Sequence, residues 1–363
     1  MSLIHPTIKG RGAAKNPPNR FVPIAIEPDG EAMDAIIAAE GELPRPGTQF
    51  LKDTSRTVIV HNDSPDVGFT FSINPYRGCE HGCIYCYARP THEYFGFSAG
   101  LDFETKIFVK EEAPQLLREE LYSPKWQPST ISISGVTDCY QPIERQLQIT
   151  RKCLQVLAEF RNPVGIVTKN HLVTRDIDLL AQLASHGAAV VMLSVTTLDA
   201  DLARKMEPRT SSPKRRLAAI EALAQANIPV GVMLAPIIPG LTDHEMHSIL
   251  KAAADAGAKF AGYVPVRLPF AVKDIFQQWL EAHYPDRKDK ILNRIRSIRG
   301  GKLNDSNFQT RMRGTGEFAD QFEQMFRLAK RKVGMNQPFP GLSSKAFRRP
   351  PRAGEQMGLF GEC

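Results

Sequence analysis

The stretch N-P-Y-R-G-C-E-H-G-C-I-Y-C-Y-A-R-P, from Asn74 to Pro90, decides how the rest of the chain is interpreted. It places Cys79, Cys83 and Cys86 in a C-x3-C-x2-C spacing. A glycine precedes each of the first two cysteines, and glycine lets the backbone curl where other residues would be strained. Such a loop can point three thiolates inward, which indicates a metal ion or an iron–sulfur cluster.

Two inorganic groups compete for these thiolates. Structural zinc usually has four protein ligands, commonly from two Cys pairs or matching His pairs. The chain has one cysteine triplet, and neither His81 nor His92 completes a zinc-finger spacing as a fourth ligand. A four-iron cluster held by three cysteines would keep one iron open, and an open iron can chelate the amino and carboxylate groups of S-adenosylmethionine. Three thiols without any metal are the remaining alternative.

Short apolar runs alternate with helical patterns between residues 67 and 266. The predicted strands are 67–73, 130–134, 163–168, 188–195, 229–235 and 259–266, and the predicted helices are 113–121, 142–160, 175–185, 199–206, 213–226 and 243–256. This alternation predicts an α/β fold with a parallel sheet and right-handed crossovers. Because the cysteine loop follows the first strand, it is expected at the carboxyl ends of the strands, where such barrels carry their active sites.

The cysteine motif, with Tyr85 before its last cysteine, resembles the signature of the radical S-adenosylmethionine superfamily. Residues 66–270 are most similar to the spore photoproduct lyase-related branch, in a bacterial group that shares the N-x-Y-R-G-C-x-H-G-C-x-Y-C start. The resemblance implies a partial (β/α)6 barrel, bound S-adenosylmethionine and a [4Fe-4S] cluster on Cys79, Cys83 and Cys86. It also implies a lyase-like radical enzyme with a reductant such as flavodoxin or ferredoxin.

Polar residues follow several of the predicted strands. The resemblance assigns contacts with S-adenosylmethionine to Ser134, Lys169 and Ser194, at the ends of the second, third and fourth strands. An ammonium group can pair with the methionyl carboxylate, and hydroxyl groups can bond the ribose or the amino group. Each of these side chains could instead cap a loop.

The segment Glu207-Pro208-Arg209-Thr210 resembles a short Glu-x-Arg-Thr signature, which makes Arg209 a second candidate for the carboxylate. The backbone around Tyr85 and apolar side chains near Met233 and Val266 are expected to hold the adenine. The implied reaction is reductive cleavage of S-adenosylmethionine to a 5′-deoxyadenosyl radical, which abstracts a hydrogen atom from a substrate in the barrel.

One position departs from the lyase pattern. Spore photoproduct lyases carry a hydrogen-donor cysteine on the second strand, and the matching residue here is Ser132. Because a serine O–H is a poor hydrogen-atom donor, repair of that same lesion is not expected. Cys139 lies nearby and is the candidate catalytic cysteine, with a small buried thiol as the favoured alternative. Cys153 lies on a predicted helix and is expected in the core.

Positive charge is concentrated near the end of the chain. Residues 285–363 hold 17 Lys and Arg against 8 Asp and Glu, whereas the whole chain has a net charge of +7. Such a region is typical of a DNA or RNA partner, although a solvated basic face fits the charge equally well. The predicted organisation is an N-terminal extension (1–65), the barrel (66–270), a basic helical region (271–340) and a flexible tail (341–363). Further predicted elements are helices at 32–40, 274–283, 287–299 and 317–332, and an edge strand at 57–60.

The tail contains a second short motif. Gln356-Met357-Gly358-Leu359-Phe360 resembles the Q-L-x-L-F peptide with which bacterial DNA-maintenance proteins dock into the sliding clamp. An exposed apolar pair on a flexible terminus suits insertion into a preformed pocket. We hypothesise that this tail binds a sliding clamp. The rival interpretation of the whole chain is then a DNA- or clamp-associated binding protein with a structural metal, and a second rival is an enzyme acting on a protein or a small metabolite.

Cysteine usage and hydropathy indicate a location. The chain has six cysteines, three of them clustered, which does not resemble a disulfide framework. We therefore expect a reducing compartment, the cytoplasm. The first residues lack the apolar run of a signal peptide, and no stretch has the length needed to cross a membrane.

Overall fold

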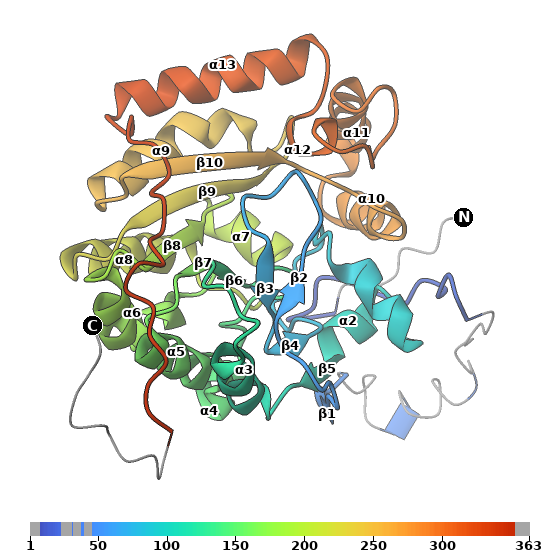
Figure 1. The fold of residues 1–363 in the computed structure, drawn as a ribbon. Helices are drawn as coiled ribbons and strands as arrows, with labels where there is room; N and C mark the ends of the chain where they lie inside the picture. Colours follow the sequence, from blue (N-terminus) through green and yellow to red (C-terminus); the bar gives the residue numbers. More distant parts are fainter. Residues whose placement is uncertain (1–7, 23–30, 32–37, 40–45, 353–363) are drawn as a thin grey trace.

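A seven-stranded sheet forms the centre of the molecule (Figure 1). The computed structural model describes residues 8–22, 31, 38–39 and 46–352. Six strands run parallel in the order β10-β9-β8-β7-β6-β3, and β2 pairs antiparallel with β3 at one edge. The strands are β2 (Val60–His61), β3 (Phe71–Ile73), β6 (Ile131–Ile133), β7 (Val164–Thr168), β8 (Ala189–Ser194), β9 (Val230–Ile237) and β10 (Phe260–Pro265).

Helices follow the parallel strands and cover one face of the sheet (Figure 1). This order confirms the predicted α/β architecture, as an open sheet with β10 and β2 at its edges in the described part of the chain. The helices up to β10 are η1 (Arg89–Phe95), α2 (Leu101–Thr105), α3 (Ala113–Tyr122), α4 (Glu144–Leu147), α5 (Ile149–Phe160), η2 (His171–Asp176), α6 (Ile177–Ala184), α7 (Ala200–Met206), α8 (Pro213–Gln225), η3 (Asp243–Glu245) and α9 (Met246–Asp255).

The two faces of the sheet differ in character. On β6, Ile131 and Ile133 are fully buried in the main hydrophobic core. Successive side chains on a strand point to opposite faces, so Ser132 faces the other side of the sheet. It lies in register with Ser72 on β3 and Gly165 on β7. The face away from the main core therefore carries a row of small residues at the centre of the sheet.

A second, three-stranded sheet was not predicted from the sequence. It has the order β1-β5-β4, with β1 at Gln49–Lys52, β5 at Lys106–Val109 and β4 at Tyr76–Arg77. β1 and β5 are parallel, whereas β4 and β5 are antiparallel. Because β4 leads directly into the cysteine loop, this small sheet fixes one end of that loop.

The helix predicted over residues 142–160 is interrupted. Gln148 has a φ of 53° and separates α4 from α5. The buried carboxylate of Glu144 accepts a hydrogen bond from the N–H of Thr150 (3.0 Å), in the first turn of α5. Since this carboxylate satisfies a donor that a helix start leaves unpaired, the break is capped by tertiary structure rather than by a local signal.

The region after β10 is helical, as predicted, and packs onto the sheet. It comprises α10 (Val272–His283), η4 (Pro285–Arg287), α11 (Lys288–Ser297), α12 (Thr310–Arg313) and α13 (Glu317–Lys332). Part of its positive charge is structural: the guanidinium of Arg299 is 3% exposed and donates to four backbone carbonyls. No helix in the described residues is long and apolar enough to cross a membrane.

The terminal segments differ from the predictions in part. Residues 341–352 were expected to be flexible. They form backbone and side-chain hydrogen bonds with residues between β5 and β8. The proposed clamp peptide Gln356–Phe360 lies outside the described residues. Most of the helix predicted over 32–40 also lies outside them.

Candidate active site

The three cysteines lie on the loop between β4 and η1, close to the carboxyl end of β3. Gly78 and Gly82 have φ angles of 79° and 69°, which confirms that glycine's conformational freedom shapes this loop. The N–H of Cys79 donates to the carbonyl of Phe103 on α2 (2.8 Å). The sequence therefore forms a loop that is anchored at its first cysteine and curls after it.

The three thiols of the motif differ in exposure. Cys79 is 7% exposed, and Cys83 and Cys86 are half-buried. Burial raises the pKa of the Cys83 and Cys86 thiols. In the described residues, no three His, Cys, Asp or Glu side chains are placed to hold a single metal ion. The cysteines of an iron–sulfur cluster bind separate irons, so they need not converge on a single point.

The two histidines near the loop have other roles. One ring nitrogen of His81 lies 3.4 Å from the Asp138 carboxylate and the other lies 3.2 Å from the amide nitrogen of Asn170. Burial alone lowers the pKa of His81, but Asp138 and the neighbouring thiolate raise it to about 10. Burial lowers the pKa of His92 to about 4, so this ring is neutral against Phe103. In the described residues, neither histidine belongs to a group of three His, Cys, Asp or Glu side chains that could hold one metal ion.

A buried ion pair lies between the cysteine loop and the carboxyl end of β8. Glu207 pairs with Arg216, and both side chains are at most 1% exposed. The hydroxyl groups of Tyr85 and Thr196 donate to the same carboxylate. Burial raises the pKa of Glu207, while the Arg216 guanidinium opposes this shift. The tyrosine of the cysteine motif is thus tied to the carboxyl end of β8.

Three of the residues predicted to bind S-adenosylmethionine gather around this ion pair. The ammonium of Lys169 lies 5.9 Å from the ring centroid of Tyr85 and donates to the carbonyl of Ala235 (3.2 Å). The buried residue Ser194 accepts a hydrogen bond at its carbonyl from Arg216 (3.0 Å). Burial lowers the pKa of Lys169. The structure therefore brings Tyr85, Lys169 and Ser194 to one place beside the cysteines.

Two other predicted residues have local partners instead. Ser134 has a φ of 86°, and its hydroxyl oxygen accepts a hydrogen bond from the N–H of Cys139 (3.0 Å). Arg209 forms an ion pair with Glu80 (3.0 Å) and not with Glu207, the partner of Arg216. Ser134 thus closes the turn after β6, and Arg209 joins two loops.

The candidate catalytic cysteine is in the core. Cys139 is fully buried in the main hydrophobic cluster, and burial raises the pKa of its thiol. Its carbonyl accepts a hydrogen bond from the hydroxyl of Thr150 (2.7 Å). Cys153 is also fully buried in this cluster. The placement of Cys139 favours a packing role over the catalytic one.

A second buried ion pair on the other side of the loop was missed in the sequence. The side chains of Arg89 and Glu104 are fully buried and pair with each other. Arg89 also donates through Nε to the carbonyl of Cys83 (2.9 Å). This guanidinium therefore supports the backbone at the second cysteine.

The N-terminal segment contacts the same buried ion pair. The carboxylate of Glu104 accepts hydrogen bonds from the N–H groups of Gly12 and Ala13, each at 2.9 Å. A Cβ added at Gly12 would lie 1.7 Å from the carbonyl oxygen of Gly82, so only glycine fits against the cysteine loop. The signal in the sequence was the group of mostly small residues at 10–14, which has no helix or strand periodicity.

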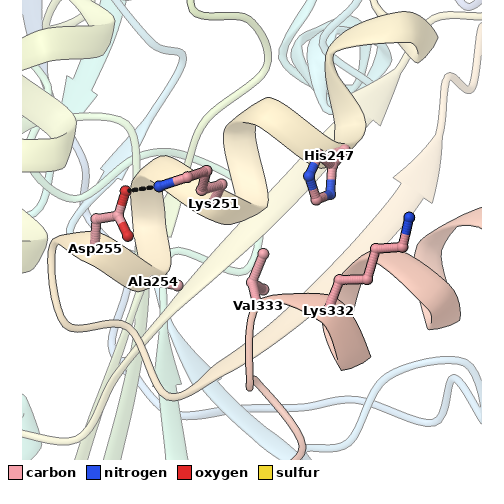
Figure 2. Close-up of a pocket in the computed structure, with 6 residues that line it drawn as sticks. All are labelled: His247, Lys251, Ala254, Asp255, Lys332 and Val333. Atoms are coloured by element: carbon pink, nitrogen blue, oxygen red, sulfur yellow. Dashed lines mark hydrogen bonds and ion pairs between the residues drawn. The ribbon is translucent and has the colours of Figure 1, made fainter.

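A surface pocket also lies away from the cysteines. Figure 2 shows it between α9 and α13, lined by His247, Lys251, Ala254, Asp255, Lys332 and Val333. Lys251 and Asp255 form an ion pair along α9 (2.7 Å). This pocket belongs to the outer helical layer and not to the candidate active site.

Residues 73–253 match the family model described as the Radical SAM superfamily. A relative from Mycobacterium tuberculosis (strain ATCC 25618 / H37Rv), described as an uncharacterized protein, is 37% identical over 232 residues, which span 63% of this chain and 67% of the relative. A second uncharacterized protein, from Methanocaldococcus jannaschii, is 29% identical over 62% of this chain and 81% of its own length.

Solved structures of spore photoproduct lyase have a similar fold. The structure of that enzyme complexed with dinucleoside spore photoproduct superposes with a TM-score of 0.58 and 17% identity, covering 84% of this chain and 92% of the lyase chain. A structure of a point mutant of the same lyase gives the same TM-score at 18% identity, with the same coverage of both chains. At this level of identity the likeness concerns the fold alone.

Proposed function

This chain belongs to the radical SAM superfamily and is an enzyme of that class, and we propose that it uses a [4Fe-4S] cluster on Cys79, Cys83 and Cys86. The bound cluster would supply one electron to S-adenosylmethionine, giving methionine and a 5′-deoxyadenosyl radical that removes a hydrogen atom from the substrate. The observation that carries this proposal is the convergence of the cysteine loop with Tyr85 and Lys169 at the carboxyl end of the sheet.

The protein's part is to bind and orient the cosubstrate. The half-buried side chain of Lys169 offers an ammonium group to the methionyl carboxylate. Ser194 ends the neighbouring strand β8 and would contact the cosubstrate's polar groups. Ser134 and Arg209 are second choices because Ser134 bonds the N–H of Cys139 and the charge of Arg209 is paired with Glu80, whereas no carboxylate of the described residues pairs with Lys169. The Glu207–Arg216 pair positions Tyr85 and does not need to touch the cosubstrate.

The substrate we propose is a nucleic acid. The excess of positive charge after residue 285 supports this choice, because polyanions concentrate near basic surfaces. Superfamily enzymes use a reductant, and we propose a flavodoxin or a ferredoxin for that role. Ser132, buried on β6 at the position of the lyase's donor cysteine in the sequence resemblance, argues for a reaction other than repair of the spore photoproduct.

The decisive experiment is anaerobic. The purified protein is reconstituted with iron and sulfide, reduced and mixed with S-adenosylmethionine, with and without added nucleic acid, and 5′-deoxyadenosine is measured. We expect product from the wild type and none from Cys83→Ala, because loss of one thiolate leaves the cluster with two of its three protein ligands.

A matched control removes a thiol elsewhere. Cys153→Ala deletes a fully buried sulfur on α5 and should keep both its iron and its product. The proposal is wrong if the wild type binds zinc but no iron. It is also wrong if a fully loaded cluster gives no 5′-deoxyadenosine in the presence of any nucleic acid tested.

A further inference from the structure

Exposed aromatic rings gather near the cysteine loop, each beside an arginine or another ring of the set. Large aromatic side chains are usually buried, so a group of exposed ones indicates a binding surface. The rings concerned are between 50% and 70% exposed and are contributed by Phe21, Tyr87, Tyr94, Phe270 and Phe308. We call these five rings, with the three arginines that contact them, the Arg–aromatic ridge.

One half of the ridge is built by the N-terminal segment. The ring of Phe21 stacks on that of Tyr94, with centroids 5.0 Å apart. The guanidinium of Arg20 lies 5.0 Å from the centroid of Phe21 and 3.6 Å from that of Phe270. An ion pair with the buried Glu93 (2.7 Å) holds Arg20 in place. This half of the ridge therefore has a fixed geometry.

The other half begins at the cysteine motif. Tyr87 directly follows the last cysteine, and the guanidinium of Arg267 lies 5.4 Å from its ring centroid. Arg311 on α12 lies 4.4 Å from the centroid of Phe308. Arg267 Nη1 is 3.3 Å from the sulfur of Met312, which joins it to α12.

The two halves meet in the loop after β10. Arg267 and Phe270 both belong to this loop, between β10 and α10. The ridge therefore runs from the N-terminal segment, across the end of β10, to α12. It passes the cysteine loop at Tyr87, so a chain bound along it would cross the candidate active site.

Arg267 differs from the other two arginines in its partners. Arg20 pairs with Glu93 and Arg311 pairs with Asp66. Among the described residues no carboxylate pairs with Arg267, and its buried Nε has no hydrogen-bond partner. A guanidinium without a carboxylate partner can bind a phosphate.

We propose that the Arg–aromatic ridge binds an unpaired stretch of nucleic acid, whose bases stack on the exposed rings and one of whose phosphates binds Arg267. Aromatic platforms combined with cationic side chains are typical of single-strand binding, because every base has a face that can stack. A duplex keeps its bases stacked on each other and cannot use the rings. This inference rests on the proposed nucleic-acid substrate and names the surface and the strand state.

The test measures binding of the reconstituted enzyme to a short fluorescent oligonucleotide, single-stranded or annealed to its complement, by anisotropy. Phe270→Ala and Phe308→Ala each remove a ring, and the control Phe318→Ala removes a phenylalanine that is 48% exposed on α13. We expect each ridge variant to raise the Kd for the single strand about fivefold or more. The control should change it less than about twofold.

Charge is tested in the same way. Arg267→Gln should lower the slope of log Kd against log salt by about 0.7, the value for one phosphate of a single strand. Arg331→Gln removes an exposed charge from α13 and should leave the slope unchanged. The proposal is overturned if the ridge variants bind like the wild type, if duplex binds as tightly as single strand, or if polyglutamate competes as well as the oligonucleotide.

These outcomes are separable from those of the proposed function. Formation of 5′-deoxyadenosine is measured on the same preparations, with and without the oligonucleotide. If the ridge variants form 5′-deoxyadenosine and bind the oligonucleotide as tightly as the wild type, the proposed binding surface is wrong and the radical chemistry stands. Tight ridge-dependent binding without any product, from a fully loaded cluster, overturns the radical chemistry and leaves the binding surface.

Discussion

Residues 8–22 and residues 337–352 both lack helices and strands, yet they lie at opposite ends of the central sheet (Figure 1). The N-terminal segment packs against the cysteine loop, near the carboxyl ends of the strands. The C-terminal segment crosses the amino ends: Phe339 contacts Phe260 at the start of β10, and the N–H of Ser343 donates to the carbonyl of Gly187 just before β8.

The contacts of the two segments differ in kind. The N-terminal segment meets two fully buried carboxylates, those of Glu104 and Glu93. The C-terminal segment meets part-buried and exposed backbone carbonyls, three of them through the guanidinium of Arg349. A buried charge that loses its partner is costly, whereas a surface carbonyl can bond water instead. We therefore infer that the N-terminal segment is part of the active site, and that the C-terminal segment only stabilises the fold.

The largest expected effect concerns Glu104, a buried carboxylate that the N-terminal segment contacts. In Glu104→Gln the amide NH2 would face N–H donors, whichever way it is turned, because both carboxylate oxygens of Glu104 accept hydrogen bonds. Arg89 would also lose its buried counter-charge. We expect a loss of about 3–5 kcal/mol in the free energy of unfolding, measured by denaturant titration.

The control for this prediction is a pair of the same chemistry at the surface. Arg118 and Glu159 form an ion pair in which the side chains are 32% and 46% exposed. Glu159→Gln should cost no more than about 1 kcal/mol. Equal losses in the free energy of unfolding for the two substitutions would contradict the expected difference between a buried and an exposed ion pair.

The next effect acts on the cysteine loop more than on global stability. Gly12→Ala would place a methyl group against the carbonyl of Gly82, so the segment or the loop must move. Overpacking of this kind costs about 1–3 kcal/mol. We expect the reconstituted variant to release iron faster to a chelator and to be cut sooner by protease within residues 8–22.

A glycine in open space provides the comparison. Gly47 has no atom within 4 Å of an added Cβ, so Gly47→Ala should release iron at the wild-type rate. If Gly12→Ala releases iron at that same rate, the N-terminal segment is not part of the cluster site. The cluster content is read from iron and sulfide analysis, and activity is not needed for this test.

Local patterns were sufficient to predict the sheet. The strand predicted over 188–195 is β8 at Ala189–Ser194, and the helix predicted over 317–332 is α13 with the same bounds. Apolar runs and amphipathic periods of this length are encoded by neighbouring residues. The cysteine loop was also predictable, because its donor spacing and its glycines lie close together in the sequence.

Contacts between distant residues were not predictable from these patterns. Glu104 meets Gly12 across 92 positions of sequence, and the strands β1 and β5 pair although the cysteine loop lies between them in the chain. The break at Gln148 depends on a buried carboxylate that caps the next helix. Burial of Cys139 could not be separated from a catalytic role without the packing around it. In each case the deciding partner is set by the fold and not by the local sequence.

The smallest expected effect belongs to the C-terminal segment. Arg349 donates to the carbonyls of Leu121, Ser123 and Trp126 at 3.0–3.2 Å, near the amino end of β6. Arg349→Ala frees these carbonyls to bond water, so we expect a loss of about 1 kcal/mol in the free energy of unfolding. Iron content and iron release should match the wild type, since this contact lies at the far end of the sheet from the cysteines. Faster iron release in Arg349→Ala would mean that both terminal segments stabilise the cysteine loop, and that the strands transmit the effect from one end of the sheet to the other.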